Sequence, residues 1–390
     1  PALVPLSRVA EPGRIALGLV DEPEHQRQPA LLLPGLVVAA AGGADAAVGG
    51  ASGGDAVGAC GGFAVVGASG SGRTTLLRTV AAQHPRVVWV PADPEGAWDA
   101  LAAVDAAPGG TALLVDDADV IAGRLPAEYA AEWLARLERA AREARGRGML
   151  VVVAAARVSG ALSRTIELLP GRALLPLASR ADHVAAGGES ADYAGDQPPG
   201  RGRWGRRLVQ FAMPDAPPAG AAFPAAVPGS ARGAAQGAGP SAVPGAAAGA
   251  ASGQPRSWRP GRTPTALVLP PGVSAERFAG GGVRLSTVDE AAASAGPAGA
   301  TAAGAGSAAP GTGSAAPGTV VWGTPEAWLG QWRLLAAMRA AGDVVIAAEC
   351  APEYRSLTGR RELPPYALPG ADRAWLLRPG GDVVRVVLPR

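Results

Sequence analysis

Residues 63–80 read FAVVGASGSGRTTLLRTV, an apolar run, a glycine-rich turn and the start of a helical pattern. The turn, Gly67 to Thr74, matches the pattern GxxxxGK[ST] at every fixed position except the lysine, where Arg73 stands. Glycines allow successive backbone N–H groups to point into one concavity, and a helix that starts there adds the positive end of its dipole. The stretch therefore predicts a phosphate-binding loop between a strand over 63–66 and a helix over 74–83.

Each position of this loop has an expected part in binding a nucleotide. The backbone and Arg73 are expected to hold the phosphates, and the hydroxyl of Thr74 is expected to reach Mg²⁺. The candidate nucleotide-binding residues are Gly67, Ala68, Ser69, Gly70, Ser71, Gly72, Arg73, Thr74 and Thr75. The alternative, a glycine-rich turn that binds nothing, is disfavoured by the strand before the loop and the helix after it.

A second acidic segment strengthens this prediction. An apolar strand predicted over 112–115 ends on Asp116 and Asp117, as expected of a Walker B segment. Asp116 is expected to hold Mg²⁺ through a water molecule, and Asp117 stands where such enzymes usually carry the glutamate that positions the attacking water. Asp116 and Asp117 are therefore the candidate catalytic residues, Thr74 and Asp116 the candidate metal ligands, and ATP and Mg²⁺ the expected cofactors.

Arg73 and Asp117 leave open whether ATP is hydrolysed. A guanidinium is planar and bulkier than an ammonium, so Arg73 cannot sit between phosphates as a lysine does. Asp117 is one methylene shorter than glutamate and is expected to hold a water less well. None of the 35 basic residues is a lysine, so Arg73 also fits a compositional bias of the whole chain. The sequence predicts nucleotide binding, with hydrolysis uncertain.

Strands and helices alternate around the loop, which predicts an α/β fold with a mainly parallel sheet. Two short strands are expected within 14–34, and further elements up to residue 212 are strands at 86–90, 149–155, 173–177 and 207–212 and helices at 96–104 and 127–145. A smaller α/β unit without a phosphate loop follows, with strands at 265–269, 283–285, 320–322, 344–347, 375–377 and 383–388 and a helix at 325–341.

Composition divides the chain further. Stretches of Ala, Gly, Pro and Ser cannot bury enough apolar surface to fold, so we expect disordered linkers. The expected division is 1–60 lead-in strands and flexible insertion, 61–213 phosphate-loop domain, 214–255 linker, 256–291 short α/β segment, 292–318 linker and 319–390 C-terminal α/β segment.

Charge, cysteine content and hydropathy exclude several classes of protein. A net charge of +2 gives no global basic field, so nucleic-acid contacts would have to be local. Cys60 and Cys350 are far apart and neither belongs to a CxxC pair, which argues against a zinc site or a disulfide framework. No apolar run approaches the roughly 20 residues of a membrane span. The chain begins at Pro1 without a signal-like segment, and we expect it to be a piece of a longer protein.

The order of four segments resembles the FtsK/SpoIIIE family, including the EccC/EssC ATPases of type VII secretion. The segments are LGLVDEPEHQRQPALLL (17–33), VVGASGSGRTTLLRTV (65–80), LLVDDAD (113–119) and SRADHVAAGG (179–188) followed by PPGRGRW (198–204). The resemblance covers about residues 13–212 and implies a RecA-like domain. It further implies a parent motor, assembled as a hexamer, that translocates double-stranded DNA with ATP hydrolysis or engages a secreted protein. Localisation would be cytoplasmic, at the inner face of the membrane through the rest of the parent protein.

The resemblance also supplies an alternative function. Terminal modules of the multi-ATPase branch are often degenerate at the phosphate loop, and Arg73 with Asp117 is similar to that condition. The alternative is therefore a weakly hydrolysing or non-hydrolysing regulatory module of a type VII secretion-like assembly.

Several other residues have two interpretations each. Arg157 and Ser159 follow a predicted strand and are either sensors of the γ-phosphate or exposed loop residues. His183 is expected to be a packed or capping side chain rather than a base. An arginine cluster beside Trp204 faces either a phosphate or solvent: Arg201, Arg203, Arg206 and Arg207. Core packing is expected to explain Trp133, Trp328, Trp332 and Trp375.

Overall fold

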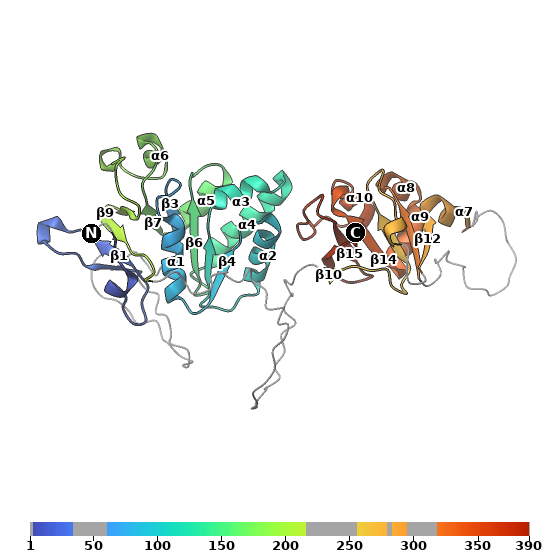
Figure 1. Cartoon of the computed structure of the whole chain (residues 1–390), viewed down its shortest axis with the longest axis horizontal. Helices are drawn as coiled ribbons and strands as arrows, with labels where there is room; N and C mark the ends of the chain where they lie inside the picture. The colour runs from blue at the N-terminus through green and yellow to red at the C-terminus, as the bar shows by residue number, and fades with distance from the viewer. Residues whose placement is uncertain (1–2, 34–60, 216–255, 279–282, 295–317, 390) are drawn as a thin grey trace, which may run out of the picture. The chain divides into compact units, whose positions relative to one another are not determined.

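The computed structural model describes residues 3–33, 61–215, 256–278, 283–294 and 318–389 (Figure 1). They belong to two compact units, Pro1–Ser252 and Gly253–Arg390. The linkers predicted over 214–255 and 292–318, and the insertion predicted before residue 61, lie almost entirely outside the described residues. No helix among the described ranges is long and apolar enough to cross a membrane.

The first unit is built on one nine-stranded sheet with the order β2-β1-β9-β8-β7-β3-β6-β5-β4. The strands that run from β7 to β4 across this order are parallel, and the remaining pairs are antiparallel. The strands are β1 (Ala16–Val20), β2 (Ala30–Leu32), β3 (Gly62–Val66), β4 (Val87–Val90), β5 (Ala112–Val115), β6 (Leu150–Ala155), β7 (Gly171–Leu174), β8 (Arg201–Trp204) and β9 (Arg207–Phe211).

Helices cover the parallel part of this sheet. Every residue of β3, β5 and β6 is buried, which is why these strands are continuous apolar runs rather than alternating ones. Alternate residues of the strands, such as Phe63 and Val65, pack with Leu76 and Leu77 of α1. The helices are α1 (Arg73–Gln83), α2 (Pro94–Asp105), α3 (Ala118–Arg124), α4 (Ala127–Glu143), α5 (Ala161–Leu168) and α6 (Arg180–Ala185), with single 3₁₀ turns η1 (Leu6–Arg8), η2 (Pro23–His25) and η3 (Ser190–Asp192).

The two lead-in strands predicted within 14–34 are confirmed, and they extend the same sheet. β1 pairs with β9, and Gly18 lies so close to β9 that a Cβ there would be 2.3 Å from the carbonyl oxygen of Gln210. Gln83, at the end of α1, hydrogen-bonds to the backbone of β1 as a neighbouring strand would. Its Oε1 accepts from the N–H of Ala16 and its Nε2 donates to the C=O of Ala16, both at 2.8 Å. The helix that follows the phosphate loop is thereby tied to the lead-in strands.

Replacing Gln83 with Ala is expected to destabilise the first unit by about 2 kcal/mol, because it leaves two buried backbone groups of Ala16 without partners. Arg78→Ala, on the exposed side of the same helix, is the control and should change the free energy of unfolding by less than about 0.5 kcal/mol. Chemical denaturation of both variants measures the difference. Equal stabilities would contradict the role given to Gln83.

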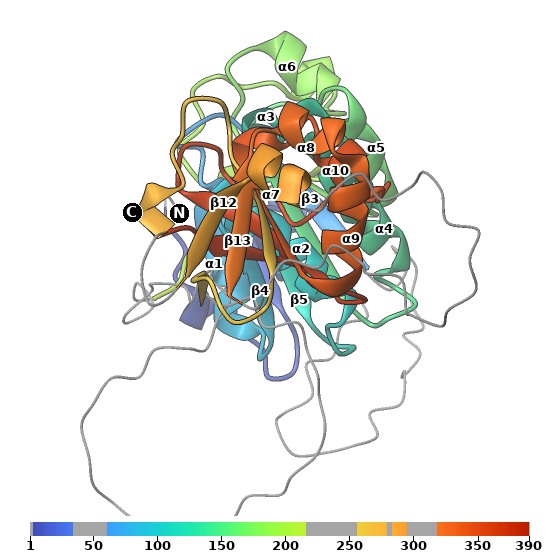
Figure 2. The same cartoon turned by 90° about the vertical axis from the view of Figure 1, so that its right-hand side faces the viewer.

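The second unit contains a seven-stranded sheet with the order β10-β16-β15-β14-β11-β13-β12. Figure 2 shows β12 and β13 of this sheet toward the viewer, with α7 and α8, which follow them in the chain, above. The strands are β10 (Arg256–Ser257), β11 (Thr265–Val268), β12 (Arg284–Thr287), β13 (Thr319–Gly323), β14 (Asp343–Ala347), β15 (Arg373–Leu377) and β16 (Val383–Val387). The helices are α7 (Val288–Ser294), α8 (Pro325–Gly330), α9 (Trp332–Ala341) and α10 (Tyr354–Thr358), with 3₁₀ turns η4 (Glu276–Phe278) and η5 (Ala348–Cys350).

The second sheet repeats part of the strand order of the first. β11, like β3, lies between two parallel neighbours, and β15 and β16 follow β14 as antiparallel strands just as β8 and β9 follow β7. The described strands include no counterpart of β2 or β4, and β10 is parallel to β16 whereas β1 is antiparallel to β9. Where β3 leads into the glycine-rich loop, β11 leads into Leu-Pro-Pro-Gly at 269–272. The second unit thus has a related topology without the sequence of a phosphate loop.

Three sequence predictions need correction. The helix predicted over 325–341 is two helices, α8 and α9, which meet at Gln331 with φ −110° and ψ 50°. Trp332 is 64% exposed at this break, so the prediction that it packs in the core is wrong, whereas Trp133, Trp328 and Trp375 are buried. The strand predicted over 173–177 ends at Leu174, and four elements of the first unit were not predicted: α3, α5, α6 and β8.

Candidate functional site

The glycine-rich loop lies between β3 and α1, as the sequence predicts. Gly70 and Gly72 have φ of 76° and 107°, which only glycine adopts without strain. Position 67 requires a glycine for steric reasons, since a Cβ there would lie 2.4 Å from Oγ of Ser71. The loop therefore closes tightly around the buried side chain of Ser71.

The loop presents a row of backbone N–H groups. Ala68 donates to the C=O of Pro176 at 2.8 Å, and Ser71 donates to the C=O of Ala68 at 3.2 Å. No acceptor among the described residues takes the N–H groups of Ser69, Gly70, Gly72, Arg73, Thr74 and Thr75. The last three belong to the first turn of α1, where the helix dipole places positive potential. This row is suited to the oxygens of an anion.

The two acidic residues after β5 reach the start of α1, which lies 42 to 44 residues earlier in the chain. The hydroxyl of Thr74 donates to Oδ2 of Asp116 at 2.6 Å, and the N–H of Asp117 donates to Oδ1 of Asp116 at 3.1 Å. Burial raises the pKa of Asp116 above its ordinary value, and the hydrogen bond from Thr74 acts in the opposite direction. Thr74 and Asp116, the predicted metal ligands, are thus adjacent.

Arg73 is held by Asp117. Its Nη2 lies 2.6 Å from Oδ1 of Asp117, and the Arg73 side chain is 10% exposed against 44% for Asp117. Asp117 adopts the left-handed conformation, with φ 48° and ψ 48°, which aspartate tolerates better than most residues. The residue predicted to hold phosphate and the residue predicted to position water are therefore paired with each other.

The donor set fits a phosphate group with Mg²⁺. Nη1 of Arg73 and Oγ of Ser71 are buried and have no hydrogen-bond partner among the described residues, so both are available to a ligand in the loop. Mg²⁺ commonly takes one or two protein oxygens together with phosphate oxygens and waters, and Thr74 with Asp116 supplies two. The Arg73–Asp117 pair must open for the guanidinium to turn toward a phosphate.

A segment distant in sequence supports the loop from outside. The N–H of Gly200 donates to the C=O of Ser71 at 2.8 Å, and a Cβ on Gly72 would lie 3.1 Å from the nitrogen of Gly200. Sequence reasoning missed this contact. The run Pro198-Pro199-Gly200 signals a turn, but nothing in it signals which part of the chain the turn will touch.

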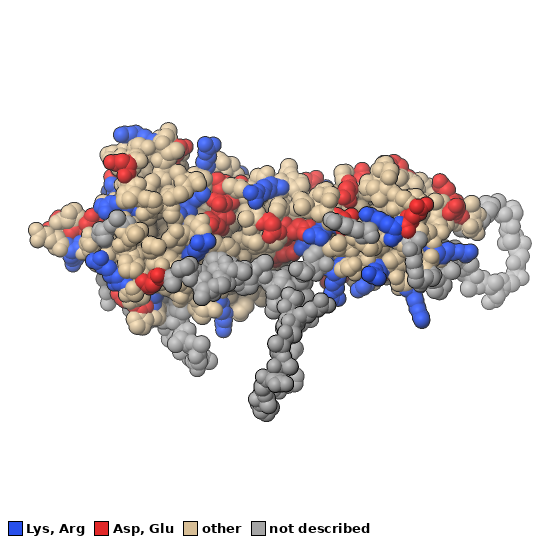
Figure 3. Space-filling view, viewed as in Figure 1, with Lys and Arg blue, Asp and Glu red and all other residues tan. Residues whose placement is uncertain are grey.

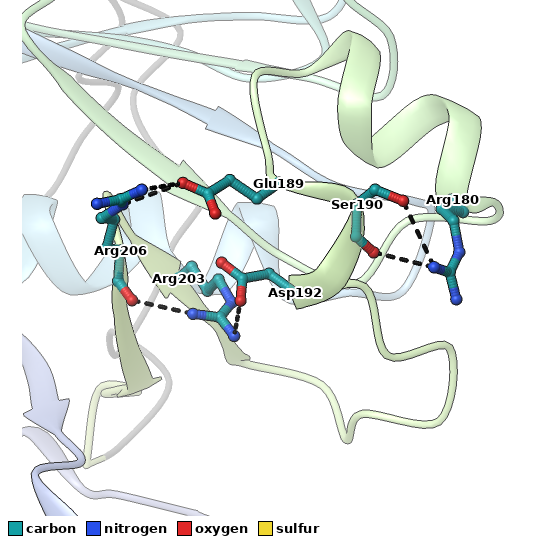
Figure 4. A network of polar contacts seen from close by, with 6 residues as sticks. All are labelled: Arg180, Glu189, Ser190, Asp192, Arg203 and Arg206. Atoms are coloured by element: carbon teal, nitrogen blue, oxygen red, sulfur yellow. Dashed lines mark hydrogen bonds and ion pairs between the residues drawn. The ribbon is translucent and has the colours of Figure 1, made fainter.

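The arginine cluster after this turn is largely neutralised by acidic partners. Figure 4 shows Arg203 beside Asp192, at 2.8 Å, and Arg206 beside Glu189, at 2.5 Å. Arg201 pairs with Asp21 at 3.1 Å. These pairs occupy three of the four guanidinium groups, while Arg207 is exposed at the start of β9.

The ring of Trp204 belongs to the core rather than to this charged surface. It is buried and meets the ring of Phe63 edge to face at 5.2 Å. The arginine cluster therefore lies on the outer side of the β8–β9 hairpin, and the Trp204 ring lies on its buried side.

The remaining candidate residues form no hydrogen bond and no ion pair with the loop among the described residues. Arg157 and Ser159 are exposed after β6, and the structure gives neither of them a contact with the loop. His183 is buried against Tyr193, as expected of a packed side chain, and burial lowers the pKa of its ring.

The parts of the chain that the structure describes contain no group of three or more His, Cys, Asp or Glu side chains placed to hold a metal ion. Cys350 is buried, and burial raises the pKa of its thiol to about 12, while Cys60 lies outside the described ranges.

No protein-family model and no curated protein matches the chain, but solved structures do. The cytoplasmic domain of the type VII secretion ATPase EccC of Thermomonospora curvata is 15% identical, with a TM-score of 0.39; the match covers 55% of this chain and 28% of that one. ATPases 2 and 3 of T. curvata EccC, in complex with a signal sequence peptide, are 13% identical, with a TM-score of 0.49 and coverage of 97% and 93%. The pCW3 conjugation coupling protein TcpA, with ATPγS, is 12% identical, with a TM-score of 0.36 and coverage of 55% and 70%.

This chain spans little more than a quarter of the EccC cytoplasmic domain. At such identities a likeness concerns the fold alone. The chain's own features are a glycine-rich loop between β3 and α1, an acidic end of β5 beside Thr74, and a mainly parallel sheet. The first unit is an α/β domain with a mainly parallel sheet and a P-loop sequence between β3 and α1, and the chain is similar to the EccC and TcpA ATPase structures named above.

Proposed function

We propose that the first unit binds ATP with Mg²⁺ at Gly67–Thr74 and turns it over slowly, as a regulatory module of a larger FtsK/SpoIIIE-type ATPase. The observation that carries the proposal is the row of N–H groups at the start of α1 that no described residue accepts from, beside the buried Nη1 of Arg73, which likewise has no partner among those residues. Together they form a preorganised anion site of the kind that nucleotide phosphates occupy.

Each residue of the site then has a defined task. The loop N–H groups and Arg73 bind phosphate oxygens, and Ser71 Oγ supplies a further donor inside the loop. Thr74 and Asp116 hold the metal ion, which neutralises phosphate charge and orients the phosphates when it is bound. Asp117 positions a water only after it has released Arg73.

The Arg73–Asp117 pair favours slow turnover over rapid hydrolysis. While the pair is formed, the carboxylate of Asp117 accepts from a guanidinium and its lone pairs are less available to a water. The planar guanidinium is also less able than the compact ammonium of a lysine to keep contact with a phosphate group as it is transferred. Binding and hydrolysis are therefore expected to be separable in this protein.

The charge of the chain favours a protein over DNA as the substrate of the parent assembly. The net charge of the whole chain is +2, and three of the four clustered arginines of the first unit are in ion pairs. Few positive charges of this cluster are therefore available to bind the phosphates of DNA. Acidic and basic side chains are interspersed over the visible face of the first unit (Figure 3). We therefore place the module in a hexameric, cytoplasmic assembly that engages a protein, and DNA translocation becomes the competing outcome of the test.

The test measures ATP affinity and hydrolysis by the full chain, with and without Mg²⁺ and with and without duplex DNA. Mg²⁺-dependent binding with turnover that DNA does not change is expected. Thr74→Val should reduce affinity in Mg²⁺ about fivefold to tenfold, to the value without metal, and Thr74→Ser should keep the wild-type value because it keeps the hydroxyl. Hydrolysis stimulated by DNA would establish a translocase instead. Absence of ATP binding would overturn the site itself.

A further inference from the structure

The second unit contains a cavity of about 110 Å³ on the side of its sheet where β14 begins. Val344, near the start of β14, pairs with Leu377, the last residue of β15, and both line the cavity. The other walls come from the end of α9, the residues after α10 and the turn between β15 and β16. Since a water needs about 10–15 Å³ of such space, the cavity has room for a group of several heavy atoms.

Three arginines from three different segments meet at this cavity. Arg339 comes from α9, Arg360 follows α10, and Arg378 begins the turn after β15. None of the described residues that line the cavity carries a carboxylate. Within the described part of the chain, the guanidinium groups of Arg339 and Arg378 form no hydrogen bond and no salt bridge. The cavity therefore concentrates positive charge, and the carboxylate that interacts with Arg378, that of Asp343, does not line it.

Hydrogen bonds connect the segments that form the walls of the cavity. Nη2 of Arg360 donates to the C=O of Gly381 at 2.7 Å, which joins the segment after α10 to the β15–β16 turn. The N–H of Arg360 donates to Oγ1 of Thr358, whose hydroxyl donates to the C=O of Tyr354 at 2.7 Å. These bonds hold one guanidinium in place and leave its other N–H groups for a ligand.

A glycine makes room for the second guanidinium. Gly359 has φ 71°, and a Cβ there would lie 3.0 Å from Nη2 of Arg339. The left-handed turn at Gly359 thus ends α10 and also lets the guanidinium of Arg339 lie over the backbone.

The acidic group that influences the third arginine is Asp343, at the start of β14. Burial raises the pKa of Asp343, and the charge of Arg378 lowers it, but the two side chains form no salt bridge. Arg378 is exposed and remains able to turn into the cavity. In Figure 3 basic side chains gather along the lower side of the second unit, and acidic ones along its upper side.

We propose that this three-arginine cavity binds a phosphate group, as the free ion or as a small monoester, independently of the loop in the first unit. Guanidinium groups match the oxygens of phosphate with paired, charge-assisted hydrogen bonds, and three of them around one cavity repel each other until an anion is bound. The apolar floor of Val344 and Leu377 excludes water beneath the ligand, which strengthens these bonds.

Hydrogen–deuterium exchange of the full chain, read by mass spectrometry, tests the site where it lies and separates it from the loop. At constant ionic strength, chloride is replaced with inorganic phosphate at about 10 mM. Hydrogen exchange of the segments 358–361 and 378–381 should then slow about threefold or more, because a bound ion restrains both walls of the cavity. Adenosine monophosphate is the second probe, and it distinguishes a site that accepts an ester from one limited to the free ion. Protection by either supports the proposal.

Matched variants make the test decisive. Arg360→Ala and Arg378→Ala should abolish the protection, Arg378→Lys should retain part of it, and Arg361→Ala, an exposed neighbour outside the cavity, should leave it intact. Equal exchange in phosphate and chloride would overturn the proposal, as would protection that survives the double Arg360→Ala/Arg378→Ala variant. Loss of ATP binding at the first unit would leave this result unchanged, so the two proposals fail separately.

Discussion

Replacing Arg73 with Ala is expected to weaken binding of Mg·ATP by about tenfold to a hundredfold. A hydrogen bond to a charged group contributes about 1.5–3 kcal/mol, and Arg73 has a buried, unpartnered Nη1 available for one. Binding by the wild type also has a cost, because Arg73 must first leave Asp117. An ion pair whose carboxylate is 44% exposed stabilises the protein by no more than about 1 kcal/mol, so this cost is small. The phosphate contact is the larger of the two effects, so affinity falls. Calorimetric titration of the full chain measures it.

The conservative variant separates binding from turnover. Arg73→Lys should bind Mg·ATP within a fewfold of wild type and hydrolyse it roughly tenfold faster or more, because it frees Asp117 to position a water. Arg78→Ala, which removes an exposed arginine of the same helix, is the control for charge and should change neither quantity. Tighter binding by Arg73→Ala would show that the Arg73–Asp117 pair closes the site rather than serving it.

Truncating Trp133 is expected to destabilise the first unit by about 3–5 kcal/mol, the usual cost of removing a fully buried indole. The side chain is completely buried in α4, and its Nε1 donates to the C=O of Ala97 in α2 at 3.0 Å. Trp133→Ala therefore creates a cavity and leaves a buried carbonyl without its donor. Native domains are stable by only about 5–15 kcal/mol, so this change removes a large part of the total.

The chain offers a matched control for this experiment. Trp332 is the same residue type in α9 but is 64% exposed, and Trp332→Ala should change stability by less than about 0.5 kcal/mol. Hydrogen exchange of β3 and β6 reports on the first unit, and exchange of β11 and β14 reports on the second. Faster exchange in both units of Trp133→Ala would contradict a local effect, and no change in either would contradict the packing described.

Local physics explains what could be predicted. The glycine-rich loop, the strand before it and the helix after it depend on backbone preferences of residues adjacent in sequence, so 63–83 was predicted almost to the residue. The buried parallel strands could be predicted for the same reason, since β5 and β6 are continuous apolar runs. The elements missed are short or polar, such as β8, whose arginines gave no apolar periodicity.

Contacts between distant segments could not be predicted. Aspartates at the end of an apolar strand indicate a Walker B segment, but whether Asp117 binds a water or Arg73 depends on its left-handed backbone and on how closely β5 approaches α1. Trp332 has the sequence spacing of a core residue, yet a break in the helix one residue earlier turns it to solvent.

Glycine conformation and apolar periodicity are properties of neighbouring residues. They were therefore enough to predict the glycine-rich loop, the alternation of strands and helices and a second unit without a phosphate-loop sequence. Three contacts depend instead on the folded chain: Gly200 supports the loop, Asp117 holds Arg73, and Arg339, Arg360 and Arg378 share one cavity. Each of these contacts joins segments whose approach depends on the packing of everything between them, and no short pattern encodes that.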